Sequence, residues 1–181
     1  PEWPKPSCST VTHPFLILLT PQNSGSTAIA QYVCSSENIE PLYEQNCEGQ
    51  WLVKGLRKAQ WDPNAYVNWA SVATVWEREG DLIKHKKPVE FFFEKSPTNI
   101  VRVDDFLKIF VSKKVVVNIR NAIATISSHL KRYTKNYPSE RRSDILQHYA
   151  FFWINVSSLL MKCSEEFSFP VIRYEDFCTN P

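Results

Sequence analysis

The chain has 181 residues, of which 43% are hydrophobic and 22% charged, and its formal net charge is +2 at pH 7. This composition is ordinary for a globular protein of one domain with a substantial core, and it excludes disordered and collagen-like chains. A charge so close to neutral also argues against a nucleic-acid binder that is held by phosphate neutralisation.

The N-terminal part of the chain predicts an irregular arm followed by a strand and a helix. Residues 1–13 contain three prolines and show no periodicity, which indicates an arm without regular structure. Residues 15–19 form a continuous apolar run between Pro14 and Pro21, typical of a short strand buried on both faces. The segment directly after this run, residues 26–34, is compatible with a helix.

The middle of the chain predicts helices that alternate with further strands. A strand is expected over residues 39–43, and residues 45–88 are expected to be mostly helical with loops. Residues 89–93 and 114–119 are dense in β-branched or aromatic side chains, which favours strands. Between them, residues 97–110 place apolar side chains at helical intervals.

The C-terminal part continues the alternation, with helices over residues 122–133 and 140–166 and a last strand over residues 170–174. Strands that alternate with helices predict an α/β fold with a parallel sheet between helices, over residues 14–181. Ligands of such sheets bind beyond the carboxyl ends of the strands. The positions to examine are therefore residues 20–27, 94–96, 120 and 174–175.

The turn after the first predicted strand is rich in small polar residues: Ser24, Gly25, Ser26 and Thr27. A turn that enters a helix presents unpaired backbone N–H groups, which together with the helix dipole and the hydroxyls form an anion cradle. The ATP-type loop GxxxxGK[ST] is absent, and no convincing acidic motif is placed to hold Mg²⁺, so no metal is expected. A simple N-capping turn is the alternative interpretation of this segment.

The chain has five cysteines, an odd number without CxxC spacing, which makes a zinc site improbable and excludes a full disulfide framework. The sequence leaves open whether one pair forms a bridge. No apolar run reaches the ~20 residues of a membrane helix, so we expect a soluble domain without a transmembrane segment in this chain. The compartment stays open between the cytoplasm and the Golgi lumen.

Four motifs follow one another along the chain, each at the end of a predicted strand: "NSGST", "EKSPTN", "VVVNIRNAIATISSHLKRY" and "VIRYEDFCTNP". In this order they resemble the sulfotransferases that use 3′-phosphoadenosine-5′-phosphosulfate (PAPS), most of all the tyrosylprotein and carbohydrate group and its bacterial relatives. The resemblance implies a three-layer α/β fold with a P-loop-like phosphosulfate-binding loop. It also implies in-line, metal-independent transfer of a sulfuryl group from PAPS to a hydroxyl acceptor, which leaves adenosine 3′,5′-bisphosphate (PAP).

The resemblance assigns the first turn to the 5′-phosphosulfate, with Ser24, Gly25, Ser26 and Thr27 in the family positions. The family has Arg or Lys directly before this Ser-Gly pair, whereas this chain has Asn23. Hydrogen bonds from an ionised donor contribute roughly 1.5–3 kcal/mol, against about 0.5–1.5 for neutral ones. The substitution therefore predicts slower chemistry with nucleotide binding intact, unless Lys95 compensates.

The resemblance assigns the 3′-phosphate to an arginine at a strand end and a serine eight residues later, which are Arg120 and Ser128 here. A further arginine of the most similar subgroup, twelve residues after the first, corresponds to Arg132. A guanidinium fork suits a phosphate group, although Arg120 taken alone also fits a surface salt bridge. Tyr174 matches a tyrosine of the family that contacts the nucleotide.

Two residues are expected to act on the reacting groups. Lys95 matches a family lysine that reaches the sulfate or the bridging oxygen, where a fixed cation stabilises the charge of the departing PAP. The base that takes the acceptor's proton is a glutamate about twenty residues past the loop in the tyrosylprotein group, and Glu44 occupies that position. The alternative is that Glu44 is simply exposed. Other candidates for the base are Glu37, Glu40 and Glu94.

The acceptor stays open among a tyrosyl peptide, a carbohydrate and a small alcohol, and a homodimer is possible. Members of the family usually continue past the "YEDF" motif with a helix and a basic loop, so we expect this C-terminal segment to be missing here. A nucleotide-binding, degenerate sulfotransferase without turnover is therefore the second hypothesis. A P-loop small-molecule kinase is a third, which the missing loop lysine disfavours.

Overall fold

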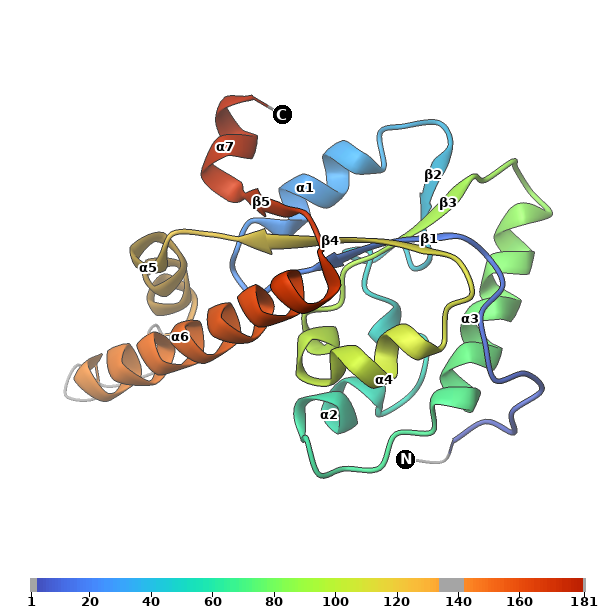
Figure 1. The fold of residues 1–181 in the computed structure, drawn as a ribbon, viewed down its shortest axis with the longest axis horizontal. Coiled ribbons are helices and arrows are strands. Elements are labelled where there is room, and N and C mark those ends of the chain that lie inside the picture. The colour runs from blue at the N-terminus through green and yellow to red at the C-terminus, as the bar shows by residue number, and fades with distance from the viewer. Residues whose placement is uncertain (1–2, 134–141, 181) are drawn as a thin grey trace.

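The computed structural model describes residues 3–133 and 142–180 and contains a five-stranded sheet between two layers of helices (Figure 1). The strands are β1 (Phe15–Leu19), β2 (Ile39–Pro41), β3 (Phe91–Glu94), β4 (Lys113–Ile119) and β5 (Val171–Arg173). The helices are α1 (Ser26–Val33), α2 (Leu56–Trp61), α3 (Trp69–Lys84), α4 (Val103–Lys108), α5 (Ala122–Tyr133), α6 (Arg142–Phe167) and α7 (Tyr174–Thr179). Two 3-10 helices, Gly49–Trp51 and Pro97–Arg102, complete the described elements. The α/β fold with a parallel sheet that the sequence predicts is confirmed.

The strand order is β2-β3-β1-β4-β5, and every pair of neighbouring strands is parallel. The chain leaves β1 toward β2 on one side and later crosses to β4 on the other side of β1. The direction of winding therefore changes at β1. A crevice forms at such a switch point beyond the carboxyl ends of the central strands, which is where ligands bind in α/β sheets.

The two faces of β1 belong to two separate apolar clusters. Phe15, Ile17 and Leu19 point into the larger cluster, where they meet residues of α3, α4 and α6. Leu16 and Leu18 point to the other face, which α1 and α7 cover. Because both faces are covered, a continuous apolar run forms this strand, as expected for a central parallel strand.

The structure shortens several of the elements that the sequence predicts. The segment expected as one helix over residues 97–110 is a 3-10 helix that changes at Val103 into the short helix α4. Tyr174, expected at the end of the last strand, is the first residue of α7. In residues 45–88, regular structure is limited to one 3-10 helix and the helices α2 and α3, with turns between them.

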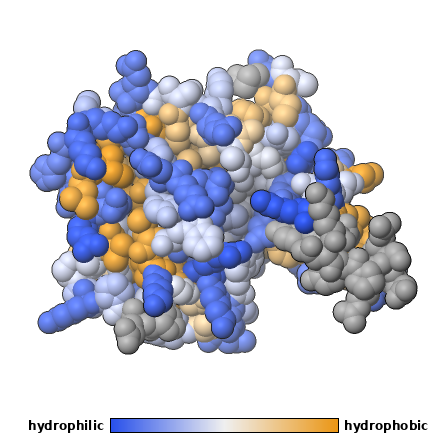
Figure 2. Space-filling model, turned by 180° about the vertical axis from the view of Figure 1, so that it is seen from behind, coloured by the Kyte–Doolittle hydropathy of each residue, from blue (hydrophilic) through white to orange (hydrophobic). Residues whose placement is uncertain are grey.

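The surface opposite the view of Figure 1 is mainly hydrophilic, with apolar areas between the charged side chains (Figure 2). Helices α5 and α6 extend to one side beyond the sheet (Figure 1). Within residues 3–133 and 142–180, no helix has both the length and the apolar character that crossing a membrane requires.

Candidate active site

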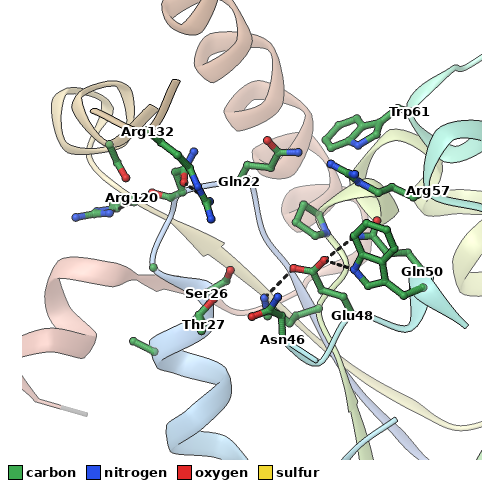
Figure 3. Close-up of a pocket in the computed structure, with 17 residues that line it drawn as sticks. Gln22, Ser26, Thr27, Asn46, Glu48, Gln50, Arg57, Trp61, Arg120 and Arg132 are labelled. Carbon is green, nitrogen blue, oxygen red and sulfur yellow. Dashed lines mark hydrogen bonds and ion pairs between the residues drawn. The ribbon is translucent and has the colours of Figure 1, made fainter. Parts of the chain in front are cut away.

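A cavity of about 520 Å³ opens at the switch point of the sheet. Its walls come from four stretches that are far apart in the sequence: the turn after β1, residues 46–61, the turn after β3, and the end of β4 with helix α5 (Figure 3). Among the lining residues, four carry a positive side chain (Arg57, Lys95, Arg120, Arg132) and one carries a carboxylate (Glu48). The cavity is therefore suited to an anion.

The turn after β1 leads directly into α1 and presents two of its hydroxyl side chains, Ser26 and Thr27, to the cavity. Gly25 is the N-cap of α1 with φ 85°, and it makes no side-chain capping bond. The segment does form the N-terminal turn of α1, as the alternative interpretation expected, but the N-cap is Gly25, which has no side chain to cap the helix. Ser26 and Thr27 line the cavity at the N-terminus of α1, beside backbone N–H groups that favour an anion.

Ser24, the first residue of the predicted cradle, does not line the cavity. Its hydroxyl is fully buried, donates to the carbonyl of Pro21 at 2.6 Å and lies 2.7 Å from the hydroxyl of Thr20. The Asn118 amide of β4 donates to both hydroxyls, at 2.9 and 3.0 Å. This buried network fixes the turn to β1 and β4, so Ser24 positions the turn without contacting the cavity.

Tyr174 packs directly against the glycine of the turn. A Cβ at Gly25 would lie 2.1 Å from the ring carbon Cε2 of Tyr174, so no side chain fits there. The guanidinium of Arg120 lies over the same ring, 4.8 Å from its centroid. Tyr174 thus holds the turn and Arg120 beside each other, although it is not itself among the residues that line the cavity.

Asn23 connects the turn to helix α5. Its backbone carbonyl accepts a hydrogen bond from Nη1 of Arg120 at 3.1 Å, and its Oδ1 accepts one from Nη1 of Arg132 at 3.2 Å. Its Nδ2 donates to Nδ1 of His129 at 2.8 Å. Asn23 has φ 58°, a left-handed conformation that asparagine tolerates better than most residues.

Nδ1 of His129 must carry no proton to accept this hydrogen bond, so the imidazole is neutral. His129 is 1% exposed and stacks on the ring of Tyr149, with centroids 4.2 Å apart. Burial lowers the pKa of His129 from 6.5 to about 4, and the nearby charge of Arg132 acts in the same direction. The contact between Asn23 and α5 is therefore intact at neutral pH.

Lys95 and Glu48 form a largely buried ion pair on the opposite side of the cavity. Nζ of Lys95 lies 3.2 Å from Oε1 of Glu48, and the two side chains are 2% and 15% exposed. The other carboxylate oxygen of Glu48 accepts a hydrogen bond from Nε1 of Trp51 at 3.1 Å and one from the amide of Gln50 (Figure 3). A lysine and a carboxylate are thus fixed side by side.

Glu94 holds the segment that carries this carboxylate. Its fully buried carboxylate accepts hydrogen bonds from the backbone N–H of Gly49 and of Ser96, each at 2.7 Å, and from the Asn99 amide at 3.0 Å. Burial raises the pKa of Glu94 above its ordinary value, while these hydrogen bonds act against the rise. Glu94 does not line the cavity, so its role is to position the chain around Gly49.

The predicted base, Glu44, is exposed and does not line the cavity; Glu48 is the carboxylate that does. The physical reason lies in the turn between them, where Asn46 and Cys47 both have positive φ angles, 59° and 55°. This turn redirects the chain, so that Glu48 lies at the cavity and Glu44, the residue that a count along the sequence selects, does not. The signal in the sequence that could have indicated this turn is the "NCEG" stretch, in which an asparagine and a glycine lie on either side of the Cys-Glu pair.

Apart from Glu44, Ser24 and Tyr174, the residues predicted for the site come together at the cavity. Asn23, Gly25, Ser26 and Thr27 line the cavity with Lys95, Arg120, Ser128 and Arg132. Glu40 is instead paired with Lys87, and Glu37 is exposed. Among the described residues, no group of three or more His, Cys, Asp or Glu side chains is arranged to hold a metal ion.

No protein-family model matches the chain, and no curated protein matches it in sequence. Its structure is similar to three solved sulfotransferases. The sulfotransferase domain from the curacin biosynthetic pathway matches with a TM-score of 0.57 and 18% identity, over 95% of this chain and 71% of that one. The sulfotransferase from Alicyclobacillus acidocaldarius matches with a TM-score of 0.58 and 13% identity, over 94% and 77%. The sulfotransferase domain from the Synechococcus PCC 7002 olefin synthase matches with a TM-score of 0.57 and 18% identity, over 100% and 73%.

Proposed function

The chain has the fold of sulfotransferase domains, and we propose that it transfers a sulfuryl group from PAPS to a hydroxyl acceptor. The observation that carries this proposal is the meeting of two anion-binding elements in one cavity. The turn of Gly25–Thr27 and the group of Arg120, Ser128 and Arg132 line the same space, although about one hundred residues separate them in the sequence. A donor that carries phosphate groups on both the 3′ and the 5′ oxygen of its ribose fits this arrangement.

In this proposal the 5′-phosphosulfate lies on the turn after β1, where the backbone N–H groups at the start of α1 and the hydroxyls of Ser26 and Thr27 face it. The 3′-phosphate lies against Arg120 and Ser128, with Arg132 beside them. Tyr174 keeps Arg120 next to the turn, so that both phosphate sites form one rigid unit.

The reaction then takes place between Lys95 and Glu48. The acceptor oxygen attacks the sulfur, the bond between the sulfur and the bridging oxygen of PAPS breaks, and PAP leaves with the bond's electron pair. Glu48 takes the proton of the acceptor hydroxyl, and the ammonium group of Lys95 stabilises the negative charge on the leaving oxygen. Their ion pair holds both groups in place before the donor binds.

A binding comparison tests the donor. PAP, AMP and Mg²⁺-ATP are titrated into the protein by calorimetry and compared in thermal melts. PAP is expected to bind more tightly than AMP because of its 3′-phosphate, and at 100 times its dissociation constant it should stabilise the protein by about 2.7 kcal/mol. Stabilisation by Mg²⁺-ATP without an effect of PAP would overturn the proposal in favour of a kinase.

A nucleotide-binding protein without turnover is the second candidate, and Asn23 favours it. The side chain that stands in place of the family's cation is engaged with His129 and Arg132 and offers no positive charge to the sulfuryl group. The test is an assay with PAPS and a panel of phenols, alcohols and sugars, on the natural chain and on Asn23→Lys. PAP binding without sulfation in both forms would support the binding protein.

A further inference from the structure

A second cavity of about 690 Å³ continues from the donor cavity and is lined by residues 50–55, 57, 58 and 61. The two cavities share four lining residues, Gln50, Trp51, Arg57 and Trp61. Arg57 and Trp61 lie on the side of the donor cavity that faces away from Arg120 and Arg132 (Figure 3). An acceptor in the second cavity would therefore reach Glu48 and Lys95 from the side opposite the 3′-phosphate.

The second cavity is positively charged. Its lining includes Lys54, Arg57 and Lys58, and no acidic side chain of the described ranges lines it. All three are exposed, and none of them forms an ion pair with a residue of the described ranges. Because these charges face the cavity and are not ion-paired with any described residue, they favour an anionic group of a ligand.

The remaining walls are flat and apolar. The indole of Trp51 is 46% exposed, Trp61 is half-buried, and Val53 and Leu52 add aliphatic surface. The guanidinium of Arg57 lies 5.0 Å from the centroid of the Trp51 ring, and Glu48 accepts the indole N–H. The exposed indole is therefore held in place and offers a fixed surface to an aromatic ring.

The cavity has few side chains that could accept hydrogen bonds from a ligand with many hydroxyl groups. Among the described residues that line it, Gln50 is the only one with an uncharged hydrogen-bonding side chain besides the tryptophans, and both ends of its amide are hydrogen-bonded. Its Oε1 accepts from the hydroxyl of Thr98 at 2.8 Å, and its Nε2 donates to Glu48. The lysine and arginine side chains of the cavity can donate to a sugar's hydroxyls but cannot accept from them, so hydroxyl protons buried here would lack acceptors, which is costly.

We propose that this second cavity is the acceptor subsite and that it selects an aryl alcohol with a negatively charged substituent. The ring lies against Trp51 and Trp61, its hydroxyl faces Glu48 and Lys95, and its anionic substituent lies among Lys54, Arg57 and Lys58. The inference rests on the proposed function, because it is the transfer of a sulfuryl group that requires a ligand of the second cavity to extend its hydroxyl into the donor cavity.

The test uses three phenols that differ in charge at one substituent: 4-hydroxyphenylacetate, 4-hydroxyphenylacetamide and tyramine. Their binding to the full chain is measured by ligand-observed NMR, with and without PAP, so that no turnover is needed. The anion is expected to bind about tenfold more tightly than the neutral amide, and tyramine more weakly than either. Equal binding of all three, or tightest binding of tyramine, would overturn the proposal.

Matched variants separate charge from ring contact. Lys58→Gln should reduce the preference for the anion and leave the neutral amide unchanged. Arg57→Gln should reduce the preference and also weaken the amide slightly, because Arg57 packs on Trp51. Trp51→Ala should weaken all three phenols. Lys114→Gln removes the same charge from an exposed position on β4 outside the cavity and serves as the control. A loss of the preference in Lys114→Gln equal to that in Arg57→Gln would attribute it to net charge and end the proposal.

The outcome also separates this inference from the proposed function. If PAP does not bind but the phenols keep their order and its dependence on Arg57, the sulfuryl transfer fails while the anionic aryl site stands. If PAP binds and glucuronate competes better than 4-hydroxyphenylacetate, the acceptor is a carbohydrate and the aryl assignment is wrong.

Discussion

Arg120 donates a hydrogen bond from Nη1 to the backbone carbonyl oxygen of Asn23, at 3.1 Å, and so joins the end of β4 to the turn after β1. The two residues are 97 positions apart in the chain. The bond connects the group proposed to hold the 3′-phosphate with the turn proposed to hold the phosphosulfate. Both ends of the donor site are therefore parts of one connected structure.

Arg120→Ala should weaken PAP much more than AMP, because the arginine is proposed to bind the phosphate that AMP lacks. The loss of a charge-assisted hydrogen bond, roughly 1.5–3 kcal/mol, corresponds to about a tenfold to hundredfold weaker affinity. Calorimetric titration of both nucleotides measures the difference. Arg173→Ala, at an exposed arginine of β5, serves as the control. Equal weakening of AMP would show that Arg120 acts only through the turn.

Glu48→Gln should lower kcat by about a hundredfold or more, the range that loss of a general base produces, with little effect on the affinity for PAP. Glu44→Gln should leave both unchanged, because Glu44 is exposed outside the cavity. Steady-state rates with PAPS and a phenol acceptor give the comparison. A strong loss in Glu44→Gln and none in Glu48→Gln would restore the assignment made from the sequence.

Gly25→Ala should destabilise the protein and weaken PAP together. The added Cβ meets the Tyr174 ring at 2.1 Å, and the φ of 85° is unfavourable for alanine, so a loss of about 1–3 kcal/mol is expected. Urea unfolding measures the free energy. In the double variant with Tyr174→Ala, the steric part of the loss should disappear, so that the two changes are less destabilising together than the sum of each alone. Strict additivity would contradict the clash.

Stability should fall as the pH drops from about 6.5 toward about 4, because of His129. Its pKa is lowered to about 4 in the folded protein, so in this window the unfolded chain binds a proton that the folded protein does not. The contribution is fully present above pH 6.5 and is lost with a slope of at most about 1.4 kcal/mol per pH unit.

Urea unfolding of the natural chain and of His129→Gln at several pH values checks this. The variant should lose less stability than the natural chain over the same window, since the other three histidines are common to both. Parallel curves would mean that His129 titrates alike in the folded and unfolded states.

Several features of the fold were predictable because local patterns carry them. The apolar run of residues 15–19, between two prolines, is typical of a strand covered on both faces, and its neighbour "KVVVNI" is dense in β-branched residues. Alternation of such runs with helical periodicity predicts parallel pairing, and the carboxyl-end rule then points to Gly25, Lys95 and Arg120. These three do line one cavity.

What the sequence by itself determined is the fold class and the edge of the sheet where the site lies, because the spacing of apolar residues and of turns is a local property. The tertiary structure decided which side chains face the cavity. Two residues with left-handed backbone conformation precede Glu48 and direct its side chain, rather than that of Glu44, toward Lys95. Ser24 is buried, so its hydroxyl faces the interior instead of the cavity. Such outcomes depend on backbone angles and on contacts between distant segments, which no count along the chain contains.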